Sequence, residues 1–223
     1  MRIDPDDVYE NEYAVTNNYN LPVTVEIMLG EWNTYAGNAG LKVEDWLSVE
    51  PKQIKLKAGE TGYVKYKVQT STAMVGSLAA SVMFTVRPPH QEMFKVRFTT
   101  FFYAHIRGTE KVDFEVLGAR FEWFGDFILG YINIKNNGNT HIRPRGTYVL
   151  KGPKIKKYTG NLLLNVPVYA ESSRSDFEMR IPKGLDMAPG KYTIDLNVTA
   201  LGKTAKKTVR FRINKDGSIT NLK

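Results

Sequence analysis

Histidines and aspartates are the first side chains to weigh for chemistry, because both can bind a metal ion or move a proton. The three histidines are His90, His105 and His141. No two of them have the spacing of metal ligands, and a surface or strand position explains each one. Asp4, Asp6 and Asp7 could hold calcium weakly, but the sequence contains no DxDxDG loop. A solvated acidic segment is the simpler interpretation of these aspartates.

Nucleophilic side chains are equally uninformative. Ser172, Ser173 and Ser175 lie in a polar stretch with no histidine or other base in the pattern. The chain has no cysteine, which excludes disulfides, thiolate catalysis and cysteine-ligated zinc. The glycines of residues 36–40 are typical of a turn rather than of a phosphate-binding loop. We therefore predict that the chain is not an enzyme and uses no cofactor and no metal.

Basic side chains are concentrated in the second half of the chain. Residues 1–107 hold 11 Lys and Arg and 12 Asp and Glu, which leaves 20 basic and 11 acidic residues for the remainder. The densest group comprises Lys151, Lys154, Lys156 and Lys157, with Tyr148 and Tyr158 on either side. Such a surface serves either solubility or contact with an anionic surface or partner. Nucleic acid is the less favoured partner, because a charge run of this kind is more often a solvated hairpin.

Short segments of alternating apolar and polar residues recur along the chain, separated by glycine, proline and asparagine. This period-two pattern is typical of β-strands. No segment repeats apolar residues at helical spacing, except for a short turn near residues 38–46. The main predicted strands are residues 13–16, 23–27, 53–57, 63–68, 80–86, 94–106, 112–116, 127–134, 146–150, 191–198 and 208–213. The chain is therefore predicted to be all-β.

Length and repetition indicate two domains. A chain of 223 residues suits two tandem immunoglobulin-like β-sandwiches of about 100 residues each. We expect an N-terminal domain over residues 1–107, a C-terminal domain over 108–214 and a polar tail over 215–223. Two short motifs look like copies of each other. Asn17-Asn18 resembles Asn136-Asn137, and Ala58-Gly59 before Tyr63 resembles Ala188-Pro189-Gly190 before Tyr192.

The long predicted strand 94–106 is the most informative element. One face carries Phe94, Val96, Phe98, Phe102 and Ile106, which we expect to be ordinary core. The opposite face and the strand end carry Lys95, Arg97, Thr99, Phe101, Tyr103 and Arg107. A long exposed edge strand invites pairing with another chain, so one that persists indicates use in binding. The second set therefore contains the candidate client-binding residues, with Pro88, Pro89 and His90 as a candidate contact loop.

The first half resembles the N-terminal domain of the periplasmic pilus-assembly chaperone family, the PapD-like proteins. The resemblance rests on an early strand that runs into Asn17-Asn18, then on Trp46 with Pro51, Ile54, Leu56 and Gly59, and on a long last strand that ends in Phe101-Phe102-Tyr103. It implies a two-domain fold and edge-strand binding of fibre subunits. Family members anchor a subunit carboxylate with an arginine and a lysine, but Asp7 and Thr100 fall at the matching positions. Arg2, Lys95, Arg97 and Arg107 are nearby alternatives.

Two hypotheses about function follow. The first is a non-enzymatic, periplasmic chaperone-like protein that caps or delivers pilus-type subunits as its protein clients. The alternative is a structural or adhesive cell-surface protein of the same fold. Both place the protein in the periplasm or outside the cell, in a bacterial envelope, although no signal peptide is recognisable at Met1. No apolar run approaches the roughly 18 residues of a membrane span.

Overall fold

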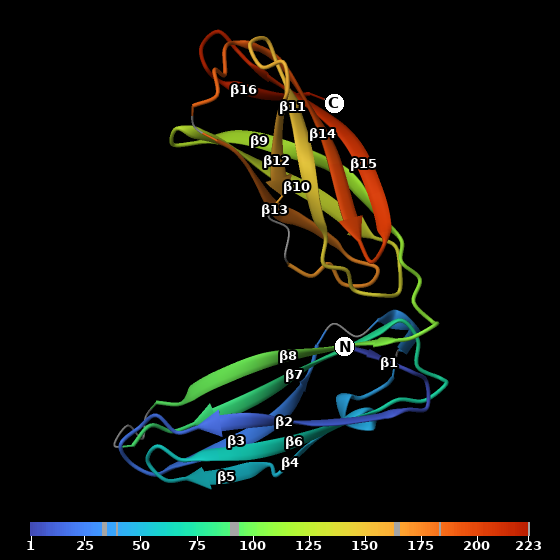
Figure 1. Ribbon diagram of the computed structural model, residues 1–223, viewed down its shortest axis with the longest axis vertical. Coiled ribbons are helices and arrows are strands. Elements are labelled where there is room, and N and C mark those ends of the chain that lie inside the picture. Colours follow the sequence, from blue (N-terminus) through green and yellow to red (C-terminus); the bar gives the residue numbers. More distant parts are fainter. Residues whose placement is uncertain (33–34, 39, 90–93, 163–165, 183, 223) are drawn as a thin grey trace. The chain divides into compact units, whose positions relative to one another are not determined.

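A computed structural model describes residues 1–32, 35–38, 40–89, 94–162, 166–182 and 184–222 (Figure 1). The chain divides into two compact units, Met1–Glu110 and Lys111–Lys223. Their regular elements are β-strands, apart from the short 3-10 helices η1 (Ala36–Asn38) and η2 (Val43–Asp45). The all-β prediction is confirmed. In the described part of the chain, no helix is long and apolar enough to cross a membrane.

Unit 1 is a sandwich of two sheets. In spatial order, one sheet contains β1 (Arg2–Ile3), β8 (Val96–Ile106), β7 (Ser77–Val86), β3 (Val23–Glu31) and β5 (Gln53–Leu56). The other contains β2 (Val8–Thr16), β6 (Thr61–Gln69) and β4 (Leu47–Glu50). Although β4 and β5 are nearly continuous in sequence, they pair in different sheets, so this part of the chain ties the two layers together. Trp46, Leu47 and Val64 are buried between the layers.

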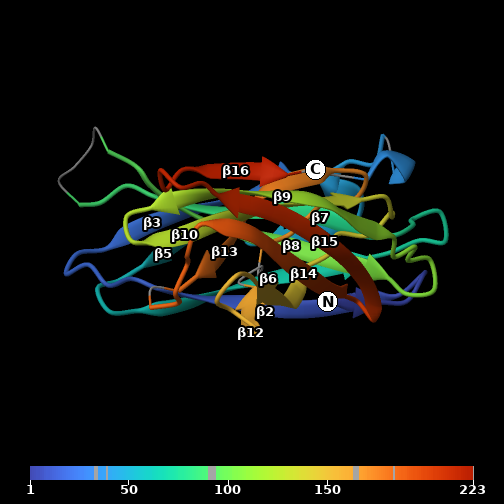
Figure 2. The same ribbon diagram turned by 90° about the horizontal axis from the view of Figure 1, so that it is seen from above.

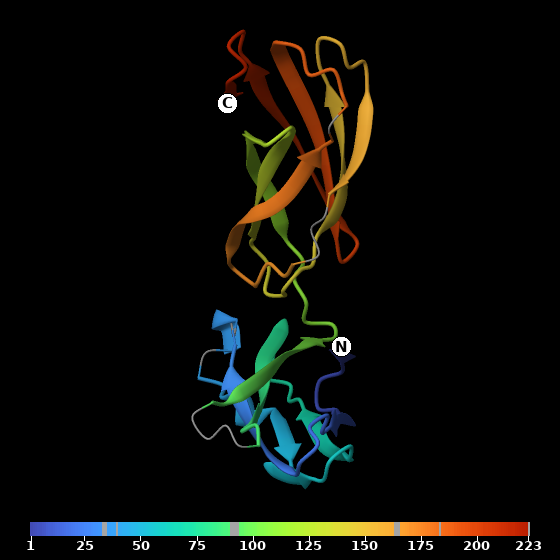
Figure 3. The ribbon, with the colours of Figure 1, turned by 90° about the vertical axis from the view of Figure 1, so that its left-hand side faces the viewer.

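Unit 2 repeats this plan with more strands. Its five-stranded sheet contains β12 (Tyr158–Leu162), β11 (Arg145–Lys151), β14 (Gly190–Ala200), β15 (Lys203–Ile213) and β16 (Ile219–Leu222). Its three-stranded sheet contains β13 (Ser173–Ile181), β10 (Phe127–Asn136) and β9 (Phe114–Phe124). Figure 3 shows the strands of each unit in two layers. Tyr148, Phe177 and Phe211 are fully buried between the layers of unit 2.

The segment expected to be a polar tail is not one. Residues 219–222 form β16, which pairs with β15 from Ile213↔Ile219 to Arg210↔Leu222. Asn221 also accepts a hydrogen bond from the main-chain N–H of Phe121 at 2.7 Å and donates one to its carbonyl at 3.2 Å. The prediction was wrong because Thr220 and Asn221 lack apolar character. Their fixed position comes from hydrogen bonds to strands distant in sequence.

Two buried asparagines organise equivalent turns in the two units. Asn17 follows β2, and its side-chain amide donates to the carbonyls of Leu21, Leu56 and Lys57 at 2.9–3.2 Å. Asn136 ends β10, and its amide donates to the carbonyls of Thr140 and Val168 at 2.8 and 3.1 Å. Each amide joins the turn after its strand to another segment. The Asn17 and Asn136 motifs are therefore structural copies.

The second predicted similarity is wrong. Ala58-Gly59 leads into β6, an inner strand of the three-stranded sheet, whereas Ala188-Pro189-Gly190 leads into β14 in the five-stranded sheet. In the second case the Tyr192 hydroxyl donates to the carbonyl of Ala188 at 2.6 Å. A tyrosine near the start of a strand that bonds back to the upstream chain is a feature of immunoglobulin-like corners. The two motifs share turn residues but not position in the fold.

Replacement of Asn136 by alanine should destabilise unit 2 strongly. The substitution leaves the carbonyl of Thr140 and the main-chain N–H of Gly138 without their side-chain partner, and each unsatisfied buried group costs about 1–3 kcal/mol. We expect the free energy of unfolding to fall by roughly 2–4 kcal/mol in urea denaturation. Asn137→Ala is the matched control, since its amide bonds only the exposed Glu115 at 3.2 Å, and should cost under about 0.5 kcal/mol. Equal losses in the two variants would contradict the role of Asn136.

Candidate strand-binding edge

The edge of β8 is open along most of its length. β1 covers only one end of this edge, where Arg2 and Ile3 pair with His105 and Ile106. In the described residues, no strand pairs with the rest of β8 on the side away from β7. Figure 1 shows β8 as the long green strand at this border of its sheet.

The direction of the main-chain groups follows from the hydrogen bonds at the covered end. Ile106 donates its N–H to Gly76 at the β7 side, whereas His105 donates to Met1 on the opposite side. In an antiparallel pair the N–H and C=O of one residue point to the same side, and the side alternates along the strand. The regular β7–β8 register extends from Ser77↔His105 to Val86↔Val96. Consequently Arg97, Thr99 and Phe101 direct their main-chain donors and acceptors outward.

An apolar groove of about 530 Å³ lies beside this edge, between β8 and β2. The side chains that give it its apolar character come from both sheets: Tyr13, Val15, Val23, Val25, Leu56, Phe84, Val86 and Phe98. Val23, Val25, Leu56 and Val86 form a small buried cluster of their own. A hydrogen bond with Thr100 lowers the pKa of Tyr13, but burial has the larger effect and raises it. The groove is thus a gap between two sheet edges with an apolar floor.

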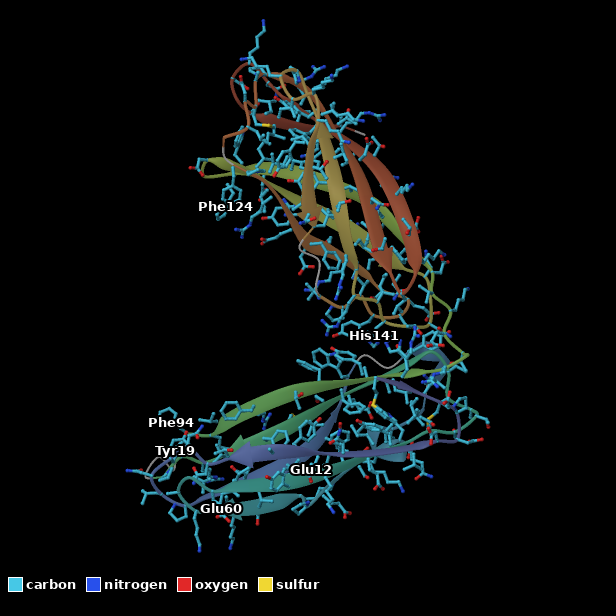
Figure 4. The ribbon with its side chains drawn as sticks, in the orientation of Figure 1. Glu12, Tyr19, Glu60, Phe94, Phe124 and His141 are labelled. Carbon is cyan, nitrogen blue, oxygen red and sulfur yellow. The ribbon has the colours of Figure 1, made fainter. Side chains whose placement is uncertain are left out.

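Phe94 and Phe98 correct the expectation that the apolar face of this strand is ordinary core. Phe102, Ala104 and Ile106 are buried as expected, but Phe94 is 67% exposed and Phe98 is 64% exposed. Phe98 is exposed because it lines the open groove, whereas Phe94 precedes β8. Figure 4 labels Phe94 at the same end of unit 1 as Tyr19, which also lines the groove. Phe98 is therefore a groove residue that sequence reasoning assigned to the core.

The predicted client-binding side chains lie on the outer face of the sheet rather than in the groove. Lys95, Arg97 and Thr99 are exposed, and Tyr103 is half-buried. Phe101 is 44% exposed and packs against Trp32, with ring centroids 4.4 Å apart. The structure thus brings these residues together along one face, and the main chain of Arg97, Thr99 and Phe101 forms the open edge. Arg107 lies beyond the strand, at the covered end.

The remaining predicted positions lie partly at buried or structural places and partly outside the described residues. In the candidate loop, Pro88 is buried and Pro89 is half-buried, whereas His90 lies outside the described residues. The serines are structural in part, since the Ser172 hydroxyl donates to the carbonyl of Tyr169 at 2.8 Å. Among the described residues, no group of three acidic, histidine or cysteine side chains could hold a metal ion.

No basic pair occupies the positions that the family resemblance implies for an anchor. Thr100 lines the groove, and Asp7 accepts a hydrogen bond from the N–H of Val8 at 2.7 Å. Two of the nearby arginines have acidic partners, whereas the Arg97 guanidinium donates to the Thr85 hydroxyl at 3.3 Å. Arg107 lies 2.9 Å from Asp4, and Arg2 lies 3.6 Å from Glu110. A carboxylate ligand at Arg2 or Arg107 would have to displace one of these ion pairs.

In the sandwich of unit 2, two added strands close the side that is open in the sandwich of unit 1. In unit 2, β9 extends the three-stranded sheet beside β10, and β16 extends the other sheet beside β15. Hydrogen bonds between Phe121 and Asn221, and from the Trp123 indole to the carbonyl of Gly217, join these added strands. In the described residues of unit 1, no strand lies along the outer edge of β2. The open groove is therefore specific to unit 1.

No family model and no curated protein matches this chain. Solved structures do match. A chain from the chaperone–tip adhesin complex of CFA/I fimbriae biogenesis has a TM-score of 0.50 at 14% identity and covers 93% of this chain and 94% of that chain. The class 5 fimbriae chaperone CfaA has a TM-score of 0.48 at 15% identity, over 93% and 94% of the two chains. The CsuC–CsuE pre-assembly complex of Acinetobacter baumannii gives 0.45 at 15% identity, over 93% of each chain.

At such identities the first of these likenesses shows a common fold. It spans both units, so the predicted plan of two tandem immunoglobulin-like sandwiches is confirmed. The resemblance to pilus-assembly chaperones is confirmed at the level of that fold.

A buried histidine at the covered end of β8 should make unit 1 sensitive to acid. Burial lowers the pKa of His105 from 6.5 to about 4, with a smaller contribution from the N-terminal ammonium. Between pH 4 and 6.5 the unfolded chain therefore binds more protons than the folded one, and stability falls as the pH falls. We expect unit 1 to unfold at lower urea concentration at pH 5 than at pH 7, and His105→Gln to reduce this difference.

The measurement follows Trp32 and Trp46, the tryptophans of unit 1, by fluorescence in a Trp123→Phe background. Comparison of the two proteins at both pH values separates His105 from the other titrating groups. The same pH dependence in both proteins would exclude His105 as its source.

Proposed function

We propose that this chain is a non-enzymatic, chaperone-like protein that binds β-rich protein clients by pairing a client strand with the open edge of β8. The observation that carries the proposal is the coincidence of this edge with an apolar groove. Main-chain hydrogen bonds to an added strand supply affinity, and pockets for alternate side chains supply selectivity. In this protein the outward groups of Arg97, Thr99 and Phe101 supply the first, and the groove beside Phe98 supplies the second.

The clients that fit this site are β-sandwich subunits with an unpaired edge or a missing strand. Such a subunit exposes apolar surface, which the exposed rings of Phe94 and Phe98 can cover. The fold shared with a chain of a chaperone–tip adhesin complex supports surface-fibre subunits as the client class. The same fold supports a place in the bacterial envelope, in the periplasm or outside the cell. Capping or delivery of such subunits is the function we infer.

A proline at position 99 tests the proposal without removing a bond to β7. The N–H of Thr99 points outward, and proline is tolerated on edge strands where the missing N–H faces solvent. We expect Thr99→Pro to remain folded but to bind client at least tenfold more weakly, because the ring removes a donor and blocks the approach of a strand. Thr99→Ala keeps the N–H and is the matched control.

The readout is a pull-down from the envelope fraction of the source organism, with captured proteins identified by mass spectrometry and the fold of each variant checked by circular dichroism. Capture of one β-sandwich subunit by wild type and Thr99→Ala, and its loss in Thr99→Pro, is the expected result. Equal capture by all three proteins would rule out pairing at β8. If all three retain only matrix or glycan material, the structural or adhesive alternative is correct.

A further inference from the structure

The outer face of the five-stranded sheet in unit 2 is strongly basic. In β14 the side chains of Tyr192, Ile194 and Leu196 are buried, so the odd-numbered positions face outward. The register pairs Lys191 with Arg212 and Thr193 with Arg210 on this same face. The cations of the face, which we name the basic face, are Arg145, Lys151, Lys191, Lys206, Arg210 and Arg212. Figure 2 shows β14 and β15, the central strands of this surface, curving side by side.

Among the described residues of the basic face there is one carboxylate, and it is already neutralised. Asp195 accepts hydrogen bonds from Lys151 at 3.1 Å and from the Thr208 hydroxyl at 2.7 Å. These two bonds, with the charges of Lys151 and Arg210, lower the pKa of Asp195. Within the described residues, the other five cations form no ion pair within 4.0 Å. A net charge of about +5 is thus left for an external partner.

The positions of these cations favour a broad partner over a small one. Arg145 pairs with Thr199 near one end of β14, and Arg212 pairs with Lys191 near the other. With about 3.3 Å per residue along a strand, the cations span roughly 25 Å. The five main grooves of the described residues include none of the six. One small anion could contact only a fraction of them, whereas an extended anionic surface could contact all.

We propose that the basic face binds the anionic headgroup surface of a phospholipid bilayer. Lys and Arg near such a surface contribute about 1 kcal/mol each, so five cations are enough for reversible binding. Threonine hydroxyls between the cations, those of Thr193, Thr204 and Thr220 among them, can donate to headgroup phosphates. Single-stranded nucleic acid fits less well, because the described residues of the face include no outward aromatic side chain on which bases could stack. The site lies in unit 2 and does not depend on the proposed function of β8.

The test is co-sedimentation of the full chain with vesicles. One set contains phosphatidylcholine alone, and the other contains equal parts of phosphatidylcholine and phosphatidylglycerol. Each set is tested at low salt and at 0.5 M salt, which differ roughly tenfold in ionic strength. The test variant is Lys206→Gln/Arg210→Gln/Arg212→Gln. The matched control is Lys52→Gln/Lys55→Gln/Lys57→Gln, which removes three exposed charges from unit 1. Circular dichroism confirms that both variants are folded.

Wild type and the control are expected to bind anionic vesicles at low salt and to release them at high salt. Neither should bind neutral vesicles. The test variant should bind about 100-fold more weakly, as the loss of three charges at about 1 kcal/mol each predicts. Equal binding by the two variants would overturn the proposal, as would binding to neutral vesicles. A parallel measurement passes the protein over immobilised duplex DNA. Retention on this DNA without binding to anionic vesicles would also overturn the proposal and would identify nucleic acid as the partner.

Discussion

Unpaired main-chain hydrogen-bonding groups along β8 are the constraint on which the rest of unit 1 depends. A peptide group buried without a partner costs free energy, so an open edge must stay in water or receive a strand. Unit 1 keeps the edge rigid by pairing β8 with β7 over its whole length and with β1 at one end. The buried half of β8, with Phe102, Ala104 and Ile106, fixes the strand in the core. The exposed half is therefore presented in an extended conformation without further ordering.

The two units differ in whether additional strands cover one side of the sandwich. In unit 2, β9 and β16 extend the sheets, and Asn221 joins them, so the apolar interior is sealed on that side. In unit 1 the corresponding gap exposes Phe98 beside the apolar floor of the groove. Both units nevertheless use a buried asparagine to fix the turn after an equivalent strand. Common local chemistry thus supports two different surfaces.

Local pattern predicted most of the fold but not the exposure of the site. The alternation over 94–106 placed β8 and its two faces correctly, because side-chain direction in a strand depends only on parity. The exposure of Phe98 depends on what lies across the groove from it, and this is β2, which is distant in sequence. The strand β13 was not predicted, although its buried residues Phe177, Met179 and Ile181 show the alternating pattern. The strand β16 could not be predicted from local pattern, because its central residues are polar and some of its hydrogen-bond partners are distant in sequence.

Lys95 and Arg97 have a consequence for how the protein behaves in solution. Two copies that joined their β8 edges in antiparallel fashion about Arg97 would bring four of these cations close together at the seam, at spacings of about 5–15 Å. Like charges at such distances repel, and edge lysines are a known protection against self-association. A strand with neutral or acidic side chains at the facing positions meets no such barrier. The charges of Lys95 and Arg97 therefore oppose this pairing of two copies without closing the edge to a different chain.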